Sequence, residues 1–127
     1  MMPVVYINCS RHPFLKWIAC GMKVYETRSR NTLRALVGKK VYLAMTGKGP
    51  SLVVCTAVIR KVFPVCSRYE WDCFRDYTAV PEGSEYDWTE STTIKYLYEL
   101  SSVKPVTVPF HPDNGVRHGR VWMEIDR

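Results

Sequence analysis

The sequence lacks the features that mark membrane-spanning and secreted proteins. Charged residues interrupt every apolar segment, so none approaches the roughly 18 to 20 residues that a bilayer-spanning helix needs. No charged-then-apolar leader opens the chain, and its five cysteines are odd in number and form no CxxC pair. We therefore expect an intracellular protein in a reducing compartment, cytoplasmic or, in a eukaryote, nuclear, with no membrane partner.

A recognisable metal site is also missing from the sequence. Its three histidines do not have the paired spacing of zinc ligands. Three of the cysteines lie inside apolar runs, where a small buried side chain is the more common role: Cys20, Cys55 and Cys73. We therefore expect neither a metal nor a cofactor.

What the sequence does contain is the composition of one basic globular domain. The 127 residues are 46% hydrophobic, which is enough for one core, so residues 1–127 are expected to form a single domain. Lys and Arg number 18 against 12 Asp and Glu, which gives a net charge of +6. This excess favours polyanionic partners through electrostatic attraction that does not depend on sequence. It is a bias toward nucleic acid and not an identification.

The first half of the chain predicts a strand, a short helix and further strands. "PVVYIN" at 3–8 is rich in β-branched and aromatic residues, as strands are. Apolar positions then recur with helical period from His12 to Cys20. Ser10 is expected to cap this helix and Gly21 to end it. Strands are also expected in "KVYETRS", "KKVYLAMTG" and "SLVVCTAVIRKVF", the last two joined by the turn "TGKGPS".

The second half predicts a helix, a loop and two more strands. Aromatic residues at helical spacing indicate a helix over 67–76, and proline, glycine and acids indicate a surface loop over 77–92. Residues 93–110 have strand composition, broken by Pro105 and Pro109. "HPDNGVRHG" is expected to be a loop before a last strand in "RVWMEID".

These elements together predict an α+β fold that is mainly β. Five or six short strands, with one helix near the start and another in the middle, indicate a small mixed sheet. We expect the sheet to close on itself as a β-barrel with two or three covering helices. Closure would also remove exposed strand edges.

A charged cluster follows the first helix. In a strand, Glu26 and Arg28 share one face, and Lys23 joins them only if it lies in the turn before the strand. Gly21 would permit that turn. Lys23 and Arg28 could then hold phosphate or carbonyl oxygens while Glu26 accepts from an exocyclic amine, each charged hydrogen bond contributing about 1 to 3 kcal/mol. The alternative is exposed ion pairing worth about 0 to 1 kcal/mol.

This cluster carries a resemblance to a known family. "GMKVYETR", preceded by "HPFLKWIACG", resembles the signature of the ASCH domain, a branch of the PUA-like superfamily of small β-barrels. Gly38 before "KKVYLA", then "VVCTAVIRKV" and "GRVWMEID", follow in the order of the transcription-coactivator type of ASCH domain. The resemblance implies a PUA-like barrel with a cleft for RNA, DNA or a nucleobase-containing ligand.

From the resemblance and the charges we expect two sets of site residues. The ligand-binding set is Ser10, His12, Lys23, Glu26 and Arg28. The rim set that would contact nucleic acid is Arg30, Lys48, Arg117, Arg120 and Trp122. The expected partner is RNA, another nucleic acid or a nucleoside. A third kind of function, binding of a protein partner, would use the acidic loop 82–90.

A hydrolase is the alternative to a binding module. Some bacterial ASCH proteins are acetylcytidine amidohydrolases in which a Lys and a Thr three residues later act together. Lys23 matches that Lys, but Glu26 occupies the Thr position and Thr27 falls on the opposite strand face. We expect Glu26 to oppose the lowered pKa that a lysine base needs. In a metal-independent ribonuclease, Glu26 or His12 could be the base and Lys23 or Arg28 the cation for the phosphate, with Lys23 and Glu26 as the expected catalytic pair.

Overall fold

The computed structural model describes residues 1–112, 115–118 and 122–126, with only the backbone path described for 115–118. It contains one sheet of seven strands in the order β2-β5-β4-β3-β1-β7-β6. The strands are β1 Met2–Asn8, β2 Tyr25–Arg28, β3 Lys40–Thr46, β4 Leu52–Val65, β5 Lys95–Phe110, β6 Gly115–His118 and β7 Trp122–Ile125. The helices are α1 Phe14–Ala19, α2 Arg68–Cys73 and α3 Arg75–Thr78, with a 3₁₀ turn at Arg34–Leu36.

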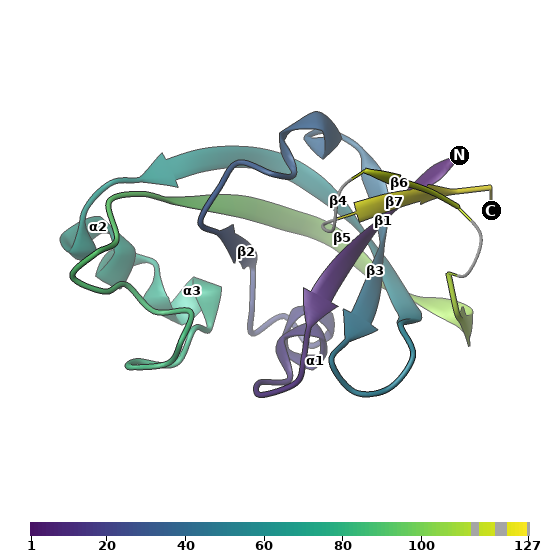
Figure 1. The fold of residues 1–127 in the computed structure, drawn as a ribbon, viewed down its shortest axis with the longest axis horizontal. Helices are drawn as coiled ribbons and strands as arrows, with labels where there is room; N and C mark the ends of the chain where they lie inside the picture. Colours follow the sequence, from purple (N-terminus) through teal and green to yellow (C-terminus); the bar gives the residue numbers. More distant parts are fainter. Residues whose placement is uncertain (113–114, 119–121, 127) are drawn as a thin grey trace.

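The predicted α+β, mainly β class is confirmed, and the sheet is mixed. β1 pairs with β3 in parallel, whereas the other strand pairs are antiparallel. Helix α1 lies beneath the sheet in Figure 1, and α2 and α3 lie together at one end of it. In the described part of the chain no helix is long and apolar enough to span a membrane.

The expected closure of the barrel is wrong. Strands β2 and β6 are the two edges of the sheet, and the described strands show no backbone pairing between them. The register explains the opening. β7 pairs with β1 only over Met2–Val5, so the second half of β1 is paired on its β3 side alone. The sheet instead curls until β2 approaches that half of β1, where Arg28 Nη2 donates to the carbonyl oxygen of Tyr6 at 2.9 Å.

Helix α1 is fixed to the sheet by its apolar side. Phe14, Leu15 and Ile18 are buried in the main core cluster. Burial of such side chains stabilises the fold by about 1.5 to 3 kcal/mol each. Gly21 has φ +86°, as expected where the chain leaves the helix. The expected cap is wrong, because α1 begins after Pro13 without a side-chain cap and the Ser10 hydroxyl donates instead to Asn8 Oδ1 at 2.7 Å.

Three further elements differ from the sequence prediction. The helix expected over 67–76 is two short helices, α2 and α3, which meet at Phe74. β5 continues through Pro105, where shifts in its register with β4 absorb the irregularity. β6 lies in the stretch expected to be a loop, because it pairs with β7, and local composition does not reveal that partner.

Candidate functional site

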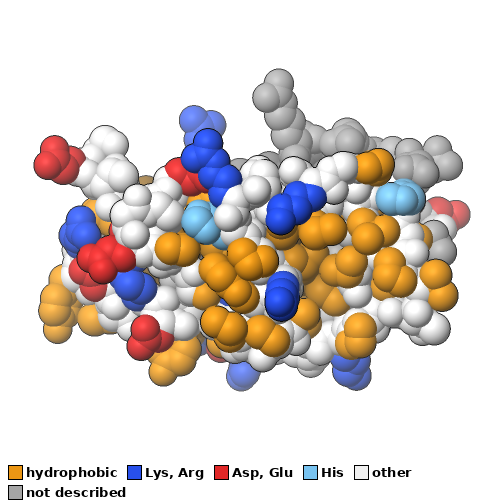
Figure 2. All heavy atoms as spheres, turned by 90° about the horizontal axis from the view of Figure 1, so that it is seen from below, with side chains coloured by type: hydrophobic (Ala, Val, Ile, Leu, Met, Phe, Trp, Pro, Cys, Tyr) orange, Lys and Arg blue, Asp and Glu red, His pale blue; other side chains and the backbone are white. Residues whose placement is uncertain are grey.

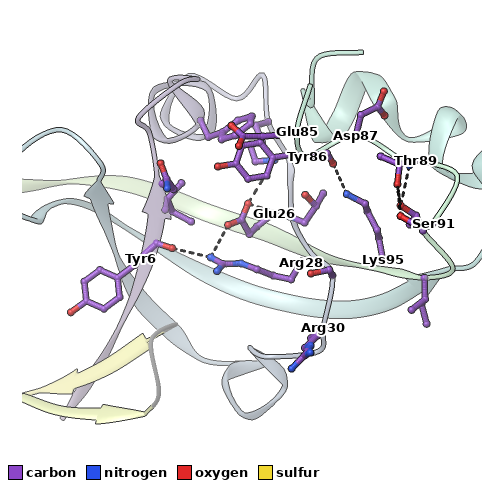
Figure 3. Close-up of a pocket in the computed structure, with 18 of the residues that line it drawn as sticks. Tyr6, Glu26, Arg28, Arg30, Glu85, Tyr86, Asp87, Thr89, Ser91 and Lys95 are labelled. Carbon is purple, nitrogen blue, oxygen red and sulfur yellow. Dashed lines mark hydrogen bonds and ion pairs between the residues drawn. The ribbon is translucent and has the colours of Figure 1, made fainter. Parts of the chain in front are cut away.

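A cavity of about 930 Å³ opens where β2 faces the unpaired side of β1. The loop over 79–94, which joins α3 to β5, forms its other wall (Figure 3). Its lining comes from β1 (Tyr6, Ile7, Asn8), α1 (Phe14), the segment around β2 (Lys23, Glu26–Arg30), β3 (Thr46) and the loop with the start of β5 (Glu85, Tyr86, Asp87, Thr89, 91–95). The cavity therefore lies in the opening between β1 and β2, which a closed barrel would lack.

Lys23, Glu26 and Arg28 converge in this cavity, and we call them the charged row. Glu26 is in the middle and is 8% exposed. Its Oε2 accepts from Arg28 Nη2 at 2.8 Å, and Lys23 Nζ lies 3.8 Å from its Oε1. Oε1 also accepts from the backbone N–H of Thr27 at 3.1 Å. One acceptor is thus flanked by two cationic donors.

Lys23 lies in the turn before β2, as the sequence analysis required for it to join the row. Its Nζ donates to the carbonyl oxygen of Thr78 at 2.7 Å and lies 4.9 Å from the centroid of the Phe14 ring. The residue is 2% exposed, and this burial lowers the pKa of the lysine, although Glu26 acts in the opposite direction. Glu26 therefore opposes the lowered pKa of Lys23, as expected, but desolvation of the ammonium is the larger effect.

Arg28 spans the cavity from β2 to β1. Its Nη2 reaches both the Tyr6 carbonyl oxygen and Glu26, and its side chain is 21% exposed. Its Nε is buried and has no hydrogen-bond partner among the described residues. The guanidinium therefore has donors left for a bound molecule.

An aromatic group adjoins the charged row. The rings of Phe14 and Tyr86 meet edge to face with centroids 5.3 Å apart, and both line the cavity. His12 packs against them, 5.3 Å from Phe14 and 6.2 Å from Tyr86. In Figure 3 the Tyr86 ring lies next to Glu26. The loop thus brings an aromatic ring, that of Tyr86, to the charges of β2.

The far end of the cavity is polar. Lys95 Nζ donates to the carbonyl oxygen of Tyr86 and lies 4.9 Å from the Trp71 ring centroid. Burial lowers the pKa of Lys95. Beside it, the Thr89 hydroxyl lies 3.1 Å from the hydroxyls of both Ser91 and Thr92. These hydroxyls suit the sugar or other polar groups of a ligand.

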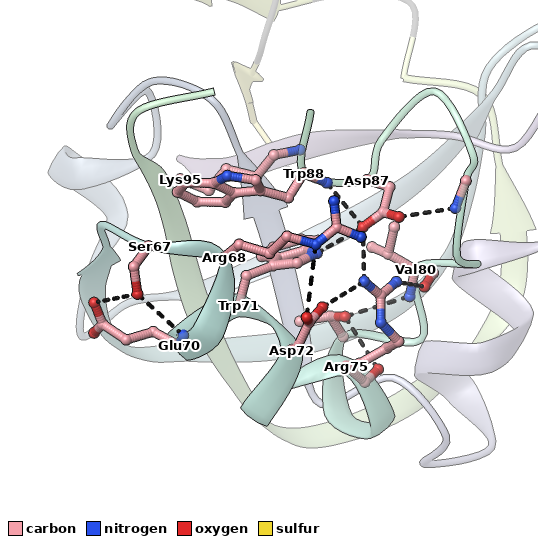
Figure 4. A network of polar contacts seen from close by, with 12 residues as sticks. Ser67, Arg68, Glu70, Trp71, Asp72, Arg75, Val80, Asp87, Trp88 and Lys95 are labelled. Carbon is pink, nitrogen blue, oxygen red and sulfur yellow. Dashed lines mark hydrogen bonds and ion pairs between the residues drawn. The ribbon is translucent and has the colours of Figure 1, made fainter. Parts of the chain in front are cut away.

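The loop wall is held by a second buried carboxylate, Asp87 (Figure 4). Its Oδ1 accepts from Trp71 Nε1 at 2.7 Å, Arg75 Nη2 at 2.9 Å and the Trp88 N–H at 2.8 Å. Its Oδ2 accepts from the Gly83 N–H at 2.8 Å. These bonds to the ionised form lower the pKa of Asp87 well below its usual range, against the effect of burial.

Several residues expected in the site lie elsewhere. Ser10 is exposed and bonded to Asn8, and His12 packs behind the aromatic group, so neither lines the cavity. Lys48 lies in the β3–β4 turn, away from the lining residues. Trp122 packs against the main core cluster from β7, because its strand pairs with the half of β1 away from the cavity.

The remaining rim residues have different outcomes. Arg30 lines the cavity and is exposed. Arg120 and the side chain of Arg117 lie outside the described residues. On the face in Figure 2, Lys and Arg side chains are scattered among apolar ones, while acidic side chains gather toward the end with α2 and α3. Among the described residues of this face, the basic side chains form no continuous surface.

The loop contributes residues to the site that the sequence did not predict. Tyr86, Asp87 and the adjoining Lys95 line the cavity, whereas the composition of the loop indicated only an acidic surface segment. Binding of a protein partner by the loop 82–90 stays a prediction. As for metals, residues 1–112, 115–118 and 122–126 hold no group of three or more His, Cys, Asp or Glu that could coordinate an ion.

Comparison with known proteins finds relatives by structure alone. No family model and no curated protein matches the sequence. The crystal structure of ASCH from Zymomonas mobilis matches with a TM-score of 0.71 and 20% identity, covering 88% of this chain and 74% of that chain. Two single-substitution variants of that protein match with TM-scores of 0.76 and 0.71 at 17% and 21% identity. They cover 99% and 88% of this chain and 89% and 76% of theirs.

The chain therefore has the fold of ASCH proteins, and the fold that the sequence resemblance implied is confirmed. At these identities the likeness concerns the fold. The transcription-coactivator type and the extent of the domain stay predictions.

Proposed function

We propose that this chain is an ASCH-type domain that binds single-stranded RNA, or a nucleotide derived from it, in the cavity between β1, β2 and the loop over 79–94. The observation that supports this most is the charged row beside the aromatic face of Tyr86 in one cavity. The volume of this cavity, about 930 Å³, is within the usual range for small-molecule sites, about 300 to 1,000 Å³.

The charged row and Tyr86 suit a nucleobase. Bases of single-stranded RNA stack on aromatic rings and are recognised through the hydrogen-bonding atoms of their edges. With the base on Tyr86, Glu26 accepts from a base N–H, and Arg28 donates to a ring nitrogen or carbonyl oxygen. The low exposure of Glu26 and Lys23 strengthens these bonds, since little water competes for them.

The backbone of the nucleotide meets the exposed part of the cavity. Arg30 follows β2 at the cavity mouth and is available to a phosphate. The hydroxyls of Thr89 and Ser91 face the sugar. Lys95 is less suited to phosphate, because its Nζ is already engaged by the Tyr86 carbonyl and the Trp71 ring. The net charge of +6 adds attraction at longer range.

Fluorescence anisotropy with a short single-stranded RNA tests this proposal. Affinity should fall as salt rises, because bound phosphates release counterions. Arg28→Ala should weaken binding at least about tenfold, which is about 1.4 kcal/mol. Arg60→Ala is the matched control, since Arg60 is an exposed arginine on the sheet that does not line the cavity. Equal affinities of the two variants, or no binding by the native chain, would contradict the proposal.

A second candidate function is hydrolysis of RNA or of an acetylated nucleoside, and one observation favours it. Lys23 is buried, its pKa is lowered, and Glu26 is its neighbour. A lysine of this kind can serve as a base. Hydrolysis predicts acetate release from N4-acetylcytidine, or RNA cleavage, that Lys23→Met abolishes. Intact substrates after long incubation with the native chain would exclude this function while leaving RNA binding in place.

A further inference from the structure

We propose that the charged row selects a uracil base over the other three RNA bases, an inference that rests on the proposed binding function. The row presents a donor, an acceptor and a donor in sequence: Lys23 Nζ, the Glu26 carboxylate and the Arg28 guanidinium. The edge of uracil presents the complementary series, carbonyl oxygen, N3–H and carbonyl oxygen.

Each member of the row has bonding capacity left for a ligand. An ammonium has three donors, and Lys23 uses one on Thr78 at 2.7 Å. Each oxygen of the Glu26 carboxylate has a pair of acceptor sites, and among the described residues Oε2 accepts one hydrogen bond, from Arg28. Arg28 directs Nη2 to Tyr6 and Glu26, which leaves the Nη1 donors for a ligand.

The burial of the row makes unmatched groups costly. Lys23 is 2% exposed and Glu26 is 8% exposed, so water cannot easily replace a missing ligand partner. A buried polar group left unpaired on binding reduces affinity, and sites built to pair a ligand group discriminate strongly against analogues that lack it. Selectivity therefore follows from how many of the three positions a base can satisfy.

The other bases satisfy fewer positions than uracil. Cytosine in the same placement turns its N3 lone pair toward the Glu26 carboxylate, which is repulsive. Shifted by one position, cytosine or adenine places its amino group on Glu26 and a ring nitrogen on Arg28, but then Lys23 gains no partner. Guanine satisfies Lys23 with O6 and Glu26 with N1–H, and its amino group either donates to the second Glu26 oxygen or faces the Arg28 guanidinium, so Arg28 gains no partner. Uracil alone matches all three.

Calorimetric titration of the full chain with nucleoside monophosphates tests this inference. We expect uridine monophosphate to bind at least about tenfold more tightly than the cytidine, adenosine or guanosine monophosphate. The N3-methyluridine monophosphate should also bind at least about tenfold more weakly than uridine monophosphate, because it lacks the central donor. This comparison uses the native protein, so folding of a variant does not enter.

A pair of variants adds a second test. Glu26→Gln replaces one acceptor oxygen by a donor amide, which can pair with cytosine N3, so the ratio of uridine to cytidine affinity should fall toward one. Glu90→Gln is the matched control, since Glu90 is an exposed carboxylate of the same loop that does not line the cavity, and it should keep the native ratio.

The outcomes separate this inference from the function on which it rests. Equal or tighter binding of the cytidine, adenosine, guanosine or N3-methyluridine monophosphate overturns the inference, while salt-dependent binding of RNA would still support the proposed function. If monophosphates do not bind but octauridine binds more tightly than octacytidine, the inference holds for a base within a strand. If neither monophosphates nor oligonucleotides bind, the inference and the proposed function both fail.

Discussion

Two carboxylates, Asp87 and Glu26, are buried near the same cavity but differ in how they are paired. Asp87 accepts four hydrogen bonds at 2.7 to 2.9 Å, two of them from backbone N–H groups. Glu26 accepts one bond from Arg28 and one from a backbone N–H, and its other cation, Lys23, is 3.8 Å away. Asp87 is therefore satisfied within the protein, whereas Glu26 retains capacity for an external donor.

The difference indicates a division of roles. Asp87 ties the loop over 79–94 to Trp71 of α2 and Arg75 of α3, and so fixes the position of Tyr86. Glu26 lies on β2, where the open side of the sheet exposes the charged row to the cavity. The hydrogen-bond network of Asp87 is complete and holds the loop wall of the cavity. Glu26 keeps free acceptor capacity and faces the proposed ligand. The predictions below test this contrast.

The largest expected effect is loss of stability on Asp87→Ala. It leaves Arg75 without its buried partner and deprives the Trp71 indole N–H of its acceptor. Removing one member of a buried pair costs about 3 to 5 kcal/mol, measurable by urea unfolding. Asp72→Ala is the control, because Asp72 pairs with the same arginine but is half-exposed, and its loss should cost about 0 to 1 kcal/mol. Equal effects would contradict the contrast.

The loss of folding stability at acid pH should also depend on Asp87. The pKa of Asp87 is lowered in the folded protein, so its stabilising contribution is complete above the unfolded-state pKa of about 3.9 and is lost as pH falls toward the folded-state value. Unfolding measured between pH 6 and pH 2 should therefore show a steep loss of stability in the native chain. The Asp87→Asn variant should have a lower free energy of unfolding at pH 6, and this free energy should fall less steeply as the pH is lowered. An unchanged slope would show that other groups cause the loss of stability in acid.

Substitution of Tyr86 tests the part of this comparison that concerns ligand binding. Replacement by Ala removes the aromatic face, and loss of base stacking should weaken RNA binding by about 1 to 3 kcal/mol. Tyr86→Phe retains the ring and should bind RNA nearly as the native chain does. Anisotropy titrations of both variants, with their melting temperatures, separate a lost platform from a lost fold. Equal weakening by the two substitutions would show that the hydroxyl, not the ring, matters.

The smallest expected effect is that of Arg30→Ala. A single phosphate contact at the cavity mouth should be lost, which lowers the slope of log affinity against log salt by about 1 and weakens binding similarly for all RNA sequences. Lys48→Ala is the matched control, because Lys48 is also exposed but does not line the cavity. A slope change in the Lys48 variant alone would move the phosphate contact to the β3–β4 turn.

Sequence patterns predicted the parts of the site that lie close together along the chain. Gly21, Lys23, Glu26 and Arg28 fall within eight positions, and the helix end and strand alternation between them suffice to orient the side chains. Tyr86 reaches the same cavity from the loop that the Asp87 network holds, and Lys95 reaches it from the start of β5, opposite Val65 of β4. No local pattern encodes either placement.

The open sheet was missed for a related reason. The sequence of β1 predicts one strand, but its two halves have different neighbours. The register of β7 determines where the second half of β1 is left with β3 as its one partner strand. Register depends on long-range pairing and on which face is buried, so the alternation in "RVWMEID" predicted the buried Met123 and Ile125 but not the strand's reach along β1.

The most direct test of the account is a chemical-shift titration of the isotopically labelled chain with octauridine. The account predicts that amide signals of 26–30 and 85–95 shift in a saturable, salt-sensitive manner and that the side-chain signals of Arg28 shift with them. Shifts confined to the β3–β4 turn or to α2, with the signals of 26–30 unchanged, would contradict it.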